Sequence, residues 1–196
     1  MSGNQKLNIV LDIGKTNVKL IFFNKNNKIV QSFNTKQKPS RQFGIKVLNS
    51  SEIYHWTIKK IESMEKKFQL DKFVCTAHAC SIALIDHDDQ ELIACTDYEF
   101  PYHKISKGYQ KIIPKFKESF TPLLENGLNT GLQLYYLKKK NPSLIKKTKY
   151  FLNYPQYIVW KMTNHFSSEI SYLGCHSHLW DFKKDKLSSL VKKLKL

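Results

Sequence analysis

The segment NIVLDIGKTNVKLIFFN, residues 8–24, predicts two β-strands joined by a tight turn. Apolar and β-branched residues fill both of its ends, and Gly14-Lys15-Thr16 separates them. Glycine accepts backbone conformations that a Cβ atom obstructs, so the chain can reverse direction here. After a second turn at 25–27, residues 28–35 alternate polar and apolar side chains as a half-buried strand does. The first 36 residues therefore predict a three-strand antiparallel meander.

Helices and short strands are expected to follow the meander. The apolar spacing of residues 53–68 predicts an amphipathic helix, with Asn49 and Glu52 placed as a capping box. Short strands are predicted at 72–76, 81–86 and 91–95, a brief apolar run at 150–152, and helices at 109–119 (short or kinked at Pro114), 129–140, 155–162 and 187–196. This order favours an α/β fold with a mixed sheet flanked by helices, in a chain of one-domain length.

The strong positive charge of the chain would be typical of a nucleic-acid-binding protein. The 196 residues contain 32 Lys and Arg against 16 Asp and Glu, a net charge of +16. All but Arg41 of the basic residues are lysine, whereas Arg is the residue that reads guanine edges and grips phosphates bidentately. A solvated lysine surface is therefore the default, and a lysine-rich nucleic-acid-binding protein on a ribonuclease-H-like core is the alternative.

The four cysteines, at positions 75, 80, 95 and 175, do not suggest a disulfide framework. Two runs, Cys75-x-x-His78-x-Cys80 and Cys175-His176-x-His178, contain zinc-ligand residue types without zinc-finger spacing. No apolar run approaches the roughly 18 residues of a membrane helix, and the N-terminus does not read as a signal peptide. We expect a soluble, cytoplasmic protein with no membrane partner.

The turn between the first two strands carries the chemistry. A buried strand ends in Asp12, and Gly14, Lys15 and Thr16 then offer backbone N–H groups, an ammonium and a hydroxyl, which suit phosphate oxygens. A strand-end carboxylate can hold Mg²⁺ together with phosphate oxygens. The turn is neither a Walker loop nor a dinucleotide fingerprint, because a strand follows it. An ordinary hairpin remains the alternative for this motif alone.

The run DIGKTNVK, residues 12–19, resembles the first phosphate motif of the actin-like ATPase fold, which sugar kinases share with actin and the seventy-kilodalton chaperones. Later segments are similar, in the right order, to the FGGY family of carbohydrate kinases. These segments are CTAHACSIALID (75–86), Cys95-Thr-Asp97, Gly131 to Leu137 with Pro142, FLNYPQYIVWKMT (151–163) and the stretch from Ser168 to Asp181. They argue against an actin-like ATPase that is not a kinase.

This resemblance implies the N-terminal, ribonuclease-H-like lobe of a two-lobe kinase that uses ATP and Mg²⁺ to phosphorylate a hydroxyl of a small sugar. The implied phosphate- and magnesium-binding residues are Asp12 (the Mg²⁺ carboxylate), Gly14, Lys15, Thr16, Asn17 and Lys19. The implied sugar-binding residues are His78, Asp97 and His176, which we expect to converge on one concave surface. A homodimer is compatible with the sequence.

Three positions depart from the common family pattern near the sugar pocket. His78 stands where many members have Gln, Cys80 where many have His, and Glu99 where many have Arg. Pentulose- and glycerol-kinase specificities are therefore disfavoured. Asp97-Tyr-Glu-Phe and Leu173-Gly-Cys-His look closer to deoxyketose kinases of the rhamnulose or fuculose type.

Two parts that the resemblance implies have no counterpart in the sequence. The family's aspartate base sits in a Gly-Asp-Gln-like stretch that we expect beyond Leu196, and the adenine-binding second lobe is absent. We therefore expect residues 1–196 to form an incomplete N-terminal lobe without kinase activity of its own. The sheet would then have an exposed edge, and the last helix would show apolar side chains to solvent, namely Leu187, Leu190, Val191 and Leu194.

Overall fold

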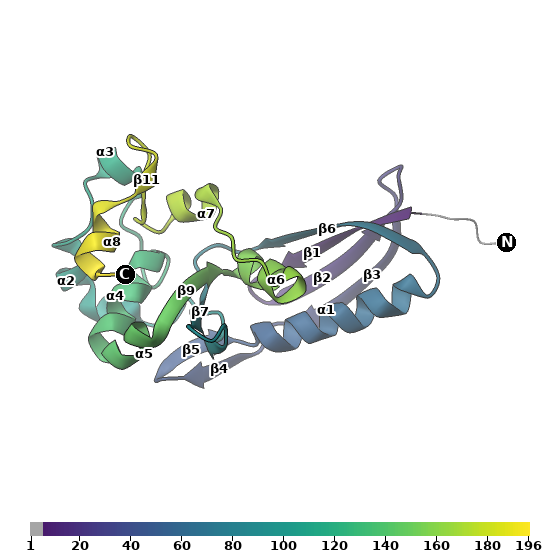
Figure 1. Cartoon of the computed structure of the whole chain (residues 1–196), viewed down its shortest axis with the longest axis horizontal. Coiled ribbons are helices and arrows are strands. Elements are labelled where there is room, and N and C mark those ends of the chain that lie inside the picture. The colour runs from purple at the N-terminus through teal and green to yellow at the C-terminus, as the bar shows by residue number, and fades with distance from the viewer. Residues whose placement is uncertain (1–5) are drawn as a thin grey trace.

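The computed structural model describes residues 6–196 (Figure 1). The strands are β1 (Lys6–Ile13), β2 (Asn17–Phe23), β3 (Ile29–Lys36), β4 (Pro39–Gln42), β5 (Ile45–Leu48), β6 (Gln69–Ala77), β7 (Ile82–Asp86), β8 (Glu91–Ile93), β9 (Thr148–Asn153), β10 (Trp180–Asp181) and β11 (Lys186–Leu187). The helices are α1 (Ser50–Glu65), the 3-10 helix η1 (Tyr102–Ile105), α2 (Ser106–Gln110), α3 (Phe116–Ser119), α4 (Thr130–Lys140), α5 (Pro142–Lys147), α6 (Tyr154–Thr163), α7 (Ile170–Cys175) and α8 (Ser189–Leu194).

The main sheet has the strand order β3-β2-β1-β6. β1 pairs with β2 and β2 with β3 in antiparallel fashion, whereas β6 runs parallel to β1 on its other side. The predicted meander and the mixed sheet are both confirmed. A parallel neighbour requires a crossover, and α1 supplies it between the meander and β6.

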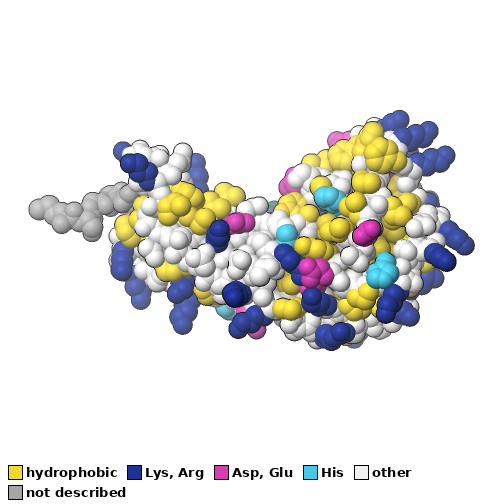
Figure 2. Space-filling view, turned by 180° about the vertical axis from the view of Figure 1, so that it is seen from behind, with side chains coloured by type: hydrophobic (Ala, Val, Ile, Leu, Met, Phe, Trp, Pro, Cys, Tyr) yellow, Lys and Arg dark blue, Asp and Glu magenta, His cyan; other side chains and the backbone are white. Residues whose placement is uncertain are grey.

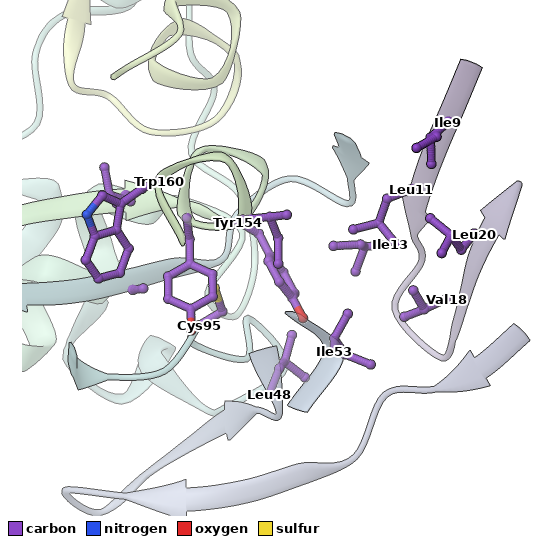
Figure 3. Close-up of a cluster of buried hydrophobic side chains, with 14 of the residues drawn as sticks. Ile9, Leu11, Ile13, Val18, Leu20, Leu48, Ile53, Cys95, Tyr154 and Trp160 are labelled. Carbon is purple, nitrogen blue, oxygen red and sulfur yellow. The ribbon is translucent and has the colours of Figure 1, made fainter. Parts of the chain in front are cut away.

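One face of this sheet is the core of the N-terminal half. Leu7, Ile9, Leu11 and Ile13 of β1 alternate with more accessible residues and are at most 4% exposed. Together with Val18 and Leu20 of β2 they pack against α1 and α6, which cover this face (Figures 1 and 3). Period-two alternation therefore buries one side of β1 and leaves Val10 and Asp12 on the other side, which no helix of the described part of the chain covers.

A second half, rich in helices, is built on a smaller sheet of order β8-β7-β9. All of β7 from Ile82 to Ile85 is buried, because one side of the strand packs on each of the two hydrophobic clusters. The second cluster is completed by residues of α4 and α8. β7 thus connects the two halves of the molecule.

The last helix differs from the expectation. Leu190 and Leu194 are 0% and 2% exposed, because α8 packs against α4. Val191 is partly buried, and only Leu187, in β11, is open to solvent at 50% exposure. The prediction that this helix shows its apolar side to solvent is wrong for Leu190 and Leu194.

Several local predictions also need correction. Asn49 does not cap α1 with its side chain; its Oδ1 accepts the N–H of Lys38 at 2.7 Å and its Nδ2 donates to Glu52 at 2.9 Å. The β4–β5 hairpin, between the meander and α1, was not predicted. The predicted helix at 109–119 is divided into α2 and α3 around Pro114, and α5, α7 and the β10–β11 pair were not anticipated.

Among residues 6–196, no helix is long and apolar enough to cross a membrane.

Candidate phosphate and sugar site

The turn between β1 and β2 is the first part of the site. The N–H of Gly14 donates to the carbonyl of Asn17 at 2.9 Å, which leaves Lys15 and Thr16 at the tip. A Cβ atom on Gly14 would lie 2.9 Å from the same Asn17 oxygen, closer than side chains approach. Glycine is therefore needed here for the close approach of the two strands, as the sequence predicted.

Neighbouring segments hold this turn from both sides. The carbonyl of Thr16 accepts the N–H of Gln37, and the carbonyl of Ile13 accepts the N–H of His78, both at 2.9 Å. Within residues 6–196 the N–H groups of Lys15 and Thr16 have no acceptor. Two adjacent unpaired donors in a braced, accessible turn have the chemistry that a phosphate oxygen requires.

Asp12 lies beside the turn on the uncovered face of the sheet. Its cross-strand partner on β2 is Lys19, and its neighbour on β6 is Thr76. Asp12, Asn17 and Lys19 are all exposed and share this face by alternation. Among the described residues Asp12 forms no ion pair, so its carboxylate is available as a metal ligand.

The donor set fits a magnesium–phosphate group but not a bare metal ion. The described residues hold no group of three His, Cys, Asp or Glu side chains placed around one point. An Mg²⁺ ion at Asp12 would therefore take its other ligands from phosphate oxygens and water, which is how this ion usually binds. The two His- and Cys-containing runs form no such group either.

Lys15 does not project to Asp12; it joins a four-residue ionic cluster. Its ammonium lies 2.8 Å from Oδ1 of Asp97 and 3.2 Å from Oε2 of Glu99. Lys46 of β5 binds the same two residues, at 3.0 Å from Oδ2 of Asp97 and 3.3 Å from Oε2 of Glu99. Figure 2 shows lysine, acidic and histidine side chains side by side where the molecule narrows near its middle. The phosphate turn and the predicted sugar-binding aspartate are thus in direct contact.

Asp97 is ionised and is held by two lysines and one backbone N–H. Burial alone would raise the pKa of its carboxyl, but Lys15, the N–H of Glu99 and Lys46 outweigh burial and hold the pKa below its usual value. The same contact with Asp97 raises the pKa of Lys46. Asp97 is 0% exposed, so a ligand reaches the cluster through the half-exposed Glu99 and the partly exposed Lys15 and Lys46.

His78 follows β6 and lies against this cluster. Its ring packs edge-on against Tyr98 and Tyr154, at centroid distances of 5.5 and 5.9 Å. Its Nδ1 lies 3.2 Å from the carbonyl of Ala79, which can only accept, so Nδ1 carries the proton. Burial, with the nearby Lys15 charge, lowers the pKa of the imidazole. The remaining Nε2 is a buried acceptor that has no hydrogen-bond partner among residues 6–196.

His176 is less closely connected. It follows α7, and the Tyr172 hydroxyl of that helix donates to the carbonyl of Ala77 at 2.7 Å, directly before His78. The Nδ1 of His176 contacts the thiol of Cys175 at 2.8 Å, and among the described contacts none joins its ring to His78 or Asp97. The structure therefore brings Lys15, His78 and Asp97 together and leaves His176 at the neighbouring helix.

Sequence reasoning missed Lys46 and Tyr98. The Lys15 ammonium lies 5.3 Å from the Tyr98 ring centroid, so the ring forms one wall of the cluster. Lys46 reaches it only because the β4–β5 hairpin, closed at Phe43-Gly44, carries it there. Gly44, at φ +78°, is the one local signal for that hairpin that the sequence contained.

Comparison with known proteins identifies the family. Residues 7–193 match the model of the N-terminal domain of the FGGY family of carbohydrate kinases. No curated protein matches the chain. Among solved structures, a carbohydrate kinase from Novosphingobium aromaticivorans is 26% identical with a TM-score of 0.88, over 97% of this chain and 40% of that one.

Two further kinases show the same fold at lower identity. A ligand-bound xylulose kinase from Lactobacillus acidophilus is 16% identical with a TM-score of 0.82, over 97% of this chain and 40% of that chain. A glycerol kinase from Plasmodium falciparum, solved with ADP, is 13% identical with a TM-score of 0.81, over 98% and 41%. The chain therefore spans about 40% of the length of these structures.

Proposed function

Because this chain belongs to the FGGY family of carbohydrate kinases, we propose that it supplies the N-terminal lobe of a two-lobe enzyme that transfers a phosphoryl group from ATP to a hydroxyl of a small sugar. The observation that carries the proposal is the direct contact between the phosphate turn and the sugar-side cluster, through Lys15 and Asp97. Phosphoryl transfer needs positioning and charge neutralisation more than covalent chemistry from the protein, and this contact provides a place for both.

The phosphate side consists of the β1–β2 turn and the uncovered sheet face beside it. The N–H groups of Lys15 and Thr16 would bind phosphate oxygens, and Gly14 permits the turn that presents them. Asp12 would hold Mg²⁺ through its exposed carboxylate, with Asn17 and Lys19 on the same face. When bound, Mg²⁺ neutralises charge on the transferred phosphoryl group.

The sugar side would use His78, Asp97 and His176 in different ways. The unpartnered Nε2 of His78 is an acceptor for a sugar hydroxyl. Asp97 acts through Lys15, since its carboxylate is closed to solvent and holds the Lys15 ammonium between the two sides. His176 would contact the sugar from α7. We assign no general base among these residues.

We propose that the sugar is a ketose or deoxyketose, and more specifically a deoxyketose of the rhamnulose or fuculose type. The support for this sugar class is that His78, Cys80 and Glu99 differ from the residues that are common in the family at these positions. Four free thiols support action in a reducing compartment such as the cytoplasm.

The experiment is titration of Mg·ATP into the chain, followed by backbone NMR. We expect the amide signals of Gly14 to Asn17 to shift, and the shift to require Mg²⁺. Asp12→Ala is expected to weaken this binding at least about tenfold, because the charge-assisted contact to the metal is lost. Asp71→Ala, which removes an exposed carboxylate from β6, is the matched control and should leave binding unchanged.

Turnover is then assayed with ATP and a panel of ketoses, deoxyketoses, aldoses and polyols. Phosphorylation abolished by Asp12→Ala would show that the chain supplies all the catalytic groups. Mg·ATP shifts that map away from the β1–β2 turn, or that persist in Asp12→Ala, would refute the assignment of the phosphate site.

A further inference from the structure

Three phenylalanines form an exposed cluster at one end of the helical half, far along the chain from the phosphate turn. Phe116 and Phe120 of the α3 region and Phe182 after β10 are 61%, 51% and 44% exposed. Their ring centroids are 5.9 Å apart for Phe116–Phe120 and 6.1 Å for Phe120–Phe182. We call these three residues the phenylalanine tip. α3 and β11 lie together at that end of the molecule (Figure 1), and the space-filling view shows a hydrophobic patch there (Figure 2).

The tip is held in place by its own backbone. The N–H of Phe182 donates to the carbonyl of Glu118, and the N–H of Ser189 to its carboxylate, both at 3.0 Å. These two bonds fasten α3 to the β10–β11 hairpin and to the start of α8. The Phe182 ring lies against Gly174, where a Cβ would come within 2.1 Å of the ring. The backbone of the tip and the Phe182 ring are therefore held in place, which reduces the entropy cost of binding.

Lysines surround the phenylalanine tip. Lys115 and Lys117 flank Phe116, Lys183 and Lys184 follow Phe182, and these four line one shallow groove. All four are exposed, as is Lys186. The acids within the groove face inward: Asp181 is 3% exposed and accepts the N–H groups of Lys183 and Lys184, and Glu118 binds Ser189. The Lys184 ammonium also lies 3.6 Å from Oδ2 of Asp181, which leaves Lys115, Lys117 and Lys183 as the unpaired lysines of the groove among the described residues. Asp185 is the one exposed acid of this hairpin.

Exposed aromatic side chains inside a ring of lysines match the chemistry of an anionic lipid surface. Apolar rings enter the boundary between headgroups and acyl chains, and lysines are attracted to the negative surface charge. An acidic protein partner would satisfy the lysines, but it would not require three protruding rings. We infer that the phenylalanine tip docks this protein on anionic membrane surfaces. This mode of binding corrects the expectation of no membrane partner, because it needs no membrane-spanning segment.

The test is co-sedimentation of the chain with vesicles of phosphatidylcholine, alone or mixed with phosphatidylglycerol. We expect binding to the mixed vesicles only, weakened by added salt because the lysine contribution is screened. The triple variant Phe116→Ser/Phe120→Ser/Phe182→Ser keeps every lysine and is expected to bind at least about tenfold more weakly.

Two matched controls separate the tip from the rest of the surface. Ile29→Ser/Phe43→Ser/Val74→Ser removes three side chains that are 62%, 54% and 57% exposed elsewhere, and should bind as the wild type does. Lys25→Gln/Lys66→Gln/Lys67→Gln should weaken binding less than Lys115→Gln/Lys117→Gln/Lys183→Gln. Circular dichroism checks that every variant is folded.

Three results would overturn the inference. The first is equal vesicle binding by the wild type and the phenylalanine variant, since the lysines alone would then explain it. The second is no binding to anionic vesicles together with retention on polyglutamate, which would assign the face to an acidic protein. The third is loss of self-association, rather than of lipid binding, in the phenylalanine variant.

Discussion

The two halves of the molecule are held together by different means. The N-terminal half has an almost wholly apolar core, in which β1 and β2 bury alternate side chains against α1 and α6. The helical half encloses polar side chains as well: Gln133, Asn129 and His178 are at most 1% exposed, and each is fully hydrogen-bonded. In the N-terminal half, alternation of apolar and polar residues buries one face of the sheet and leaves the other face free to bind ligands. In the helical half, the hydrogen bonds of these buried polar side chains fix how the irregular segments pack together.

The largest effect expected from this comparison is at adjacent residues of β1. Leu11 is 0% exposed in the apolar core, so Leu11→Ala should lower the free energy of unfolding by about 3 kcal/mol. Asp12→Ala, on the opposite face, should change it by less than about 0.5 kcal/mol while weakening Mg·ATP binding at least about tenfold. Urea denaturation followed by circular dichroism measures both. Similar destabilisation by the two substitutions would contradict the separation of core face and chemical face.

Gln133→Leu tests the polar core of the helical half. The Gln133 amide donates to the carbonyls of Cys80 and Gly127, both at 2.6 Å, and accepts from the Thr96 hydroxyl at 2.5 Å. Leucine leaves these buried groups unpaired, so we expect a loss of about 2 kcal/mol in spite of the greater hydrophobicity. Gln31→Leu, on an exposed strand, is the control. A stabilised Gln133→Leu variant would show that apolar packing dominates in both halves.

The pH dependence of stability should originate largely in the helical half. His178 accepts from the Tyr109 hydroxyl and donates to the carbonyl of Thr121, both at 3.0 Å, and burial lowers its pKa from 6.5 to about 4. The unfolded chain therefore binds more protons than the folded chain between those pH values. Stability should be complete above pH 6.5 and fall by about 2–3 kcal/mol as the pH decreases to 4.

Denaturation curves at several pH values measure this effect, with His178→Gln expected to flatten the slope and the exposed His103→Gln to leave it unchanged. His78, whose pKa is also lowered, adds a smaller dependence of the same sign. Asp97 acts in a separate range, because its stabilisation is lost only as the pH falls through its lowered carboxyl pKa. An unchanged slope in His178→Gln would count against a neutral His178.

The smallest effect is expected for a surface ion pair on the β9 edge of the helical half. Lys149 lies 3.6 Å from Asp89, and both side chains are accessible to water. Solvent screening makes such pairs weak, so Lys149→Gln should leave the melting temperature unchanged within error. A clear decrease would mean that surface charge, and not only the buried polar groups, stabilises this half.

How well the sequence predicts each half follows from the same contrast. Residues 8–35 predict β1, β2 and β3 correctly because alternation of apolar and polar residues is a local signal. Gly14 marks the turn, where the close approach of Asn17 leaves no room for a Cβ atom. The N-terminal lobe fold and the kinase family were likewise predicted and are confirmed. The roles of the site residues remain predictions, and the observed geometry defines how to test them.

The structural features that were not predicted from the sequence depend on contacts between segments that are far apart in the chain. The side chain of Asn49 binds Lys38 rather than capping α1, and Leu190 is buried only because α4 lies beside α8. In both cases the contacting residues are too far apart in the sequence for a local pattern of apolar and polar residues to reveal the contact. The ionic cluster is missed for the same reason, since Lys15, Lys46 and Asp97 come from three separate segments.

The cluster of Lys15, Lys46, Asp97 and Glu99 also has a consequence for how charged molecules approach the chain. Its two ammonium groups and two carboxylates cancel, although the whole chain carries +16. The long-range field that draws an anion to the protein therefore originates in lysines elsewhere, and it acts on the rate of encounter. At the cluster itself an incoming anion meets no net charge. The cluster must therefore distinguish between anionic ligands by the fit of individual hydrogen bonds. Added salt should lower the association rate of an anion far more than it changes which anion is preferred.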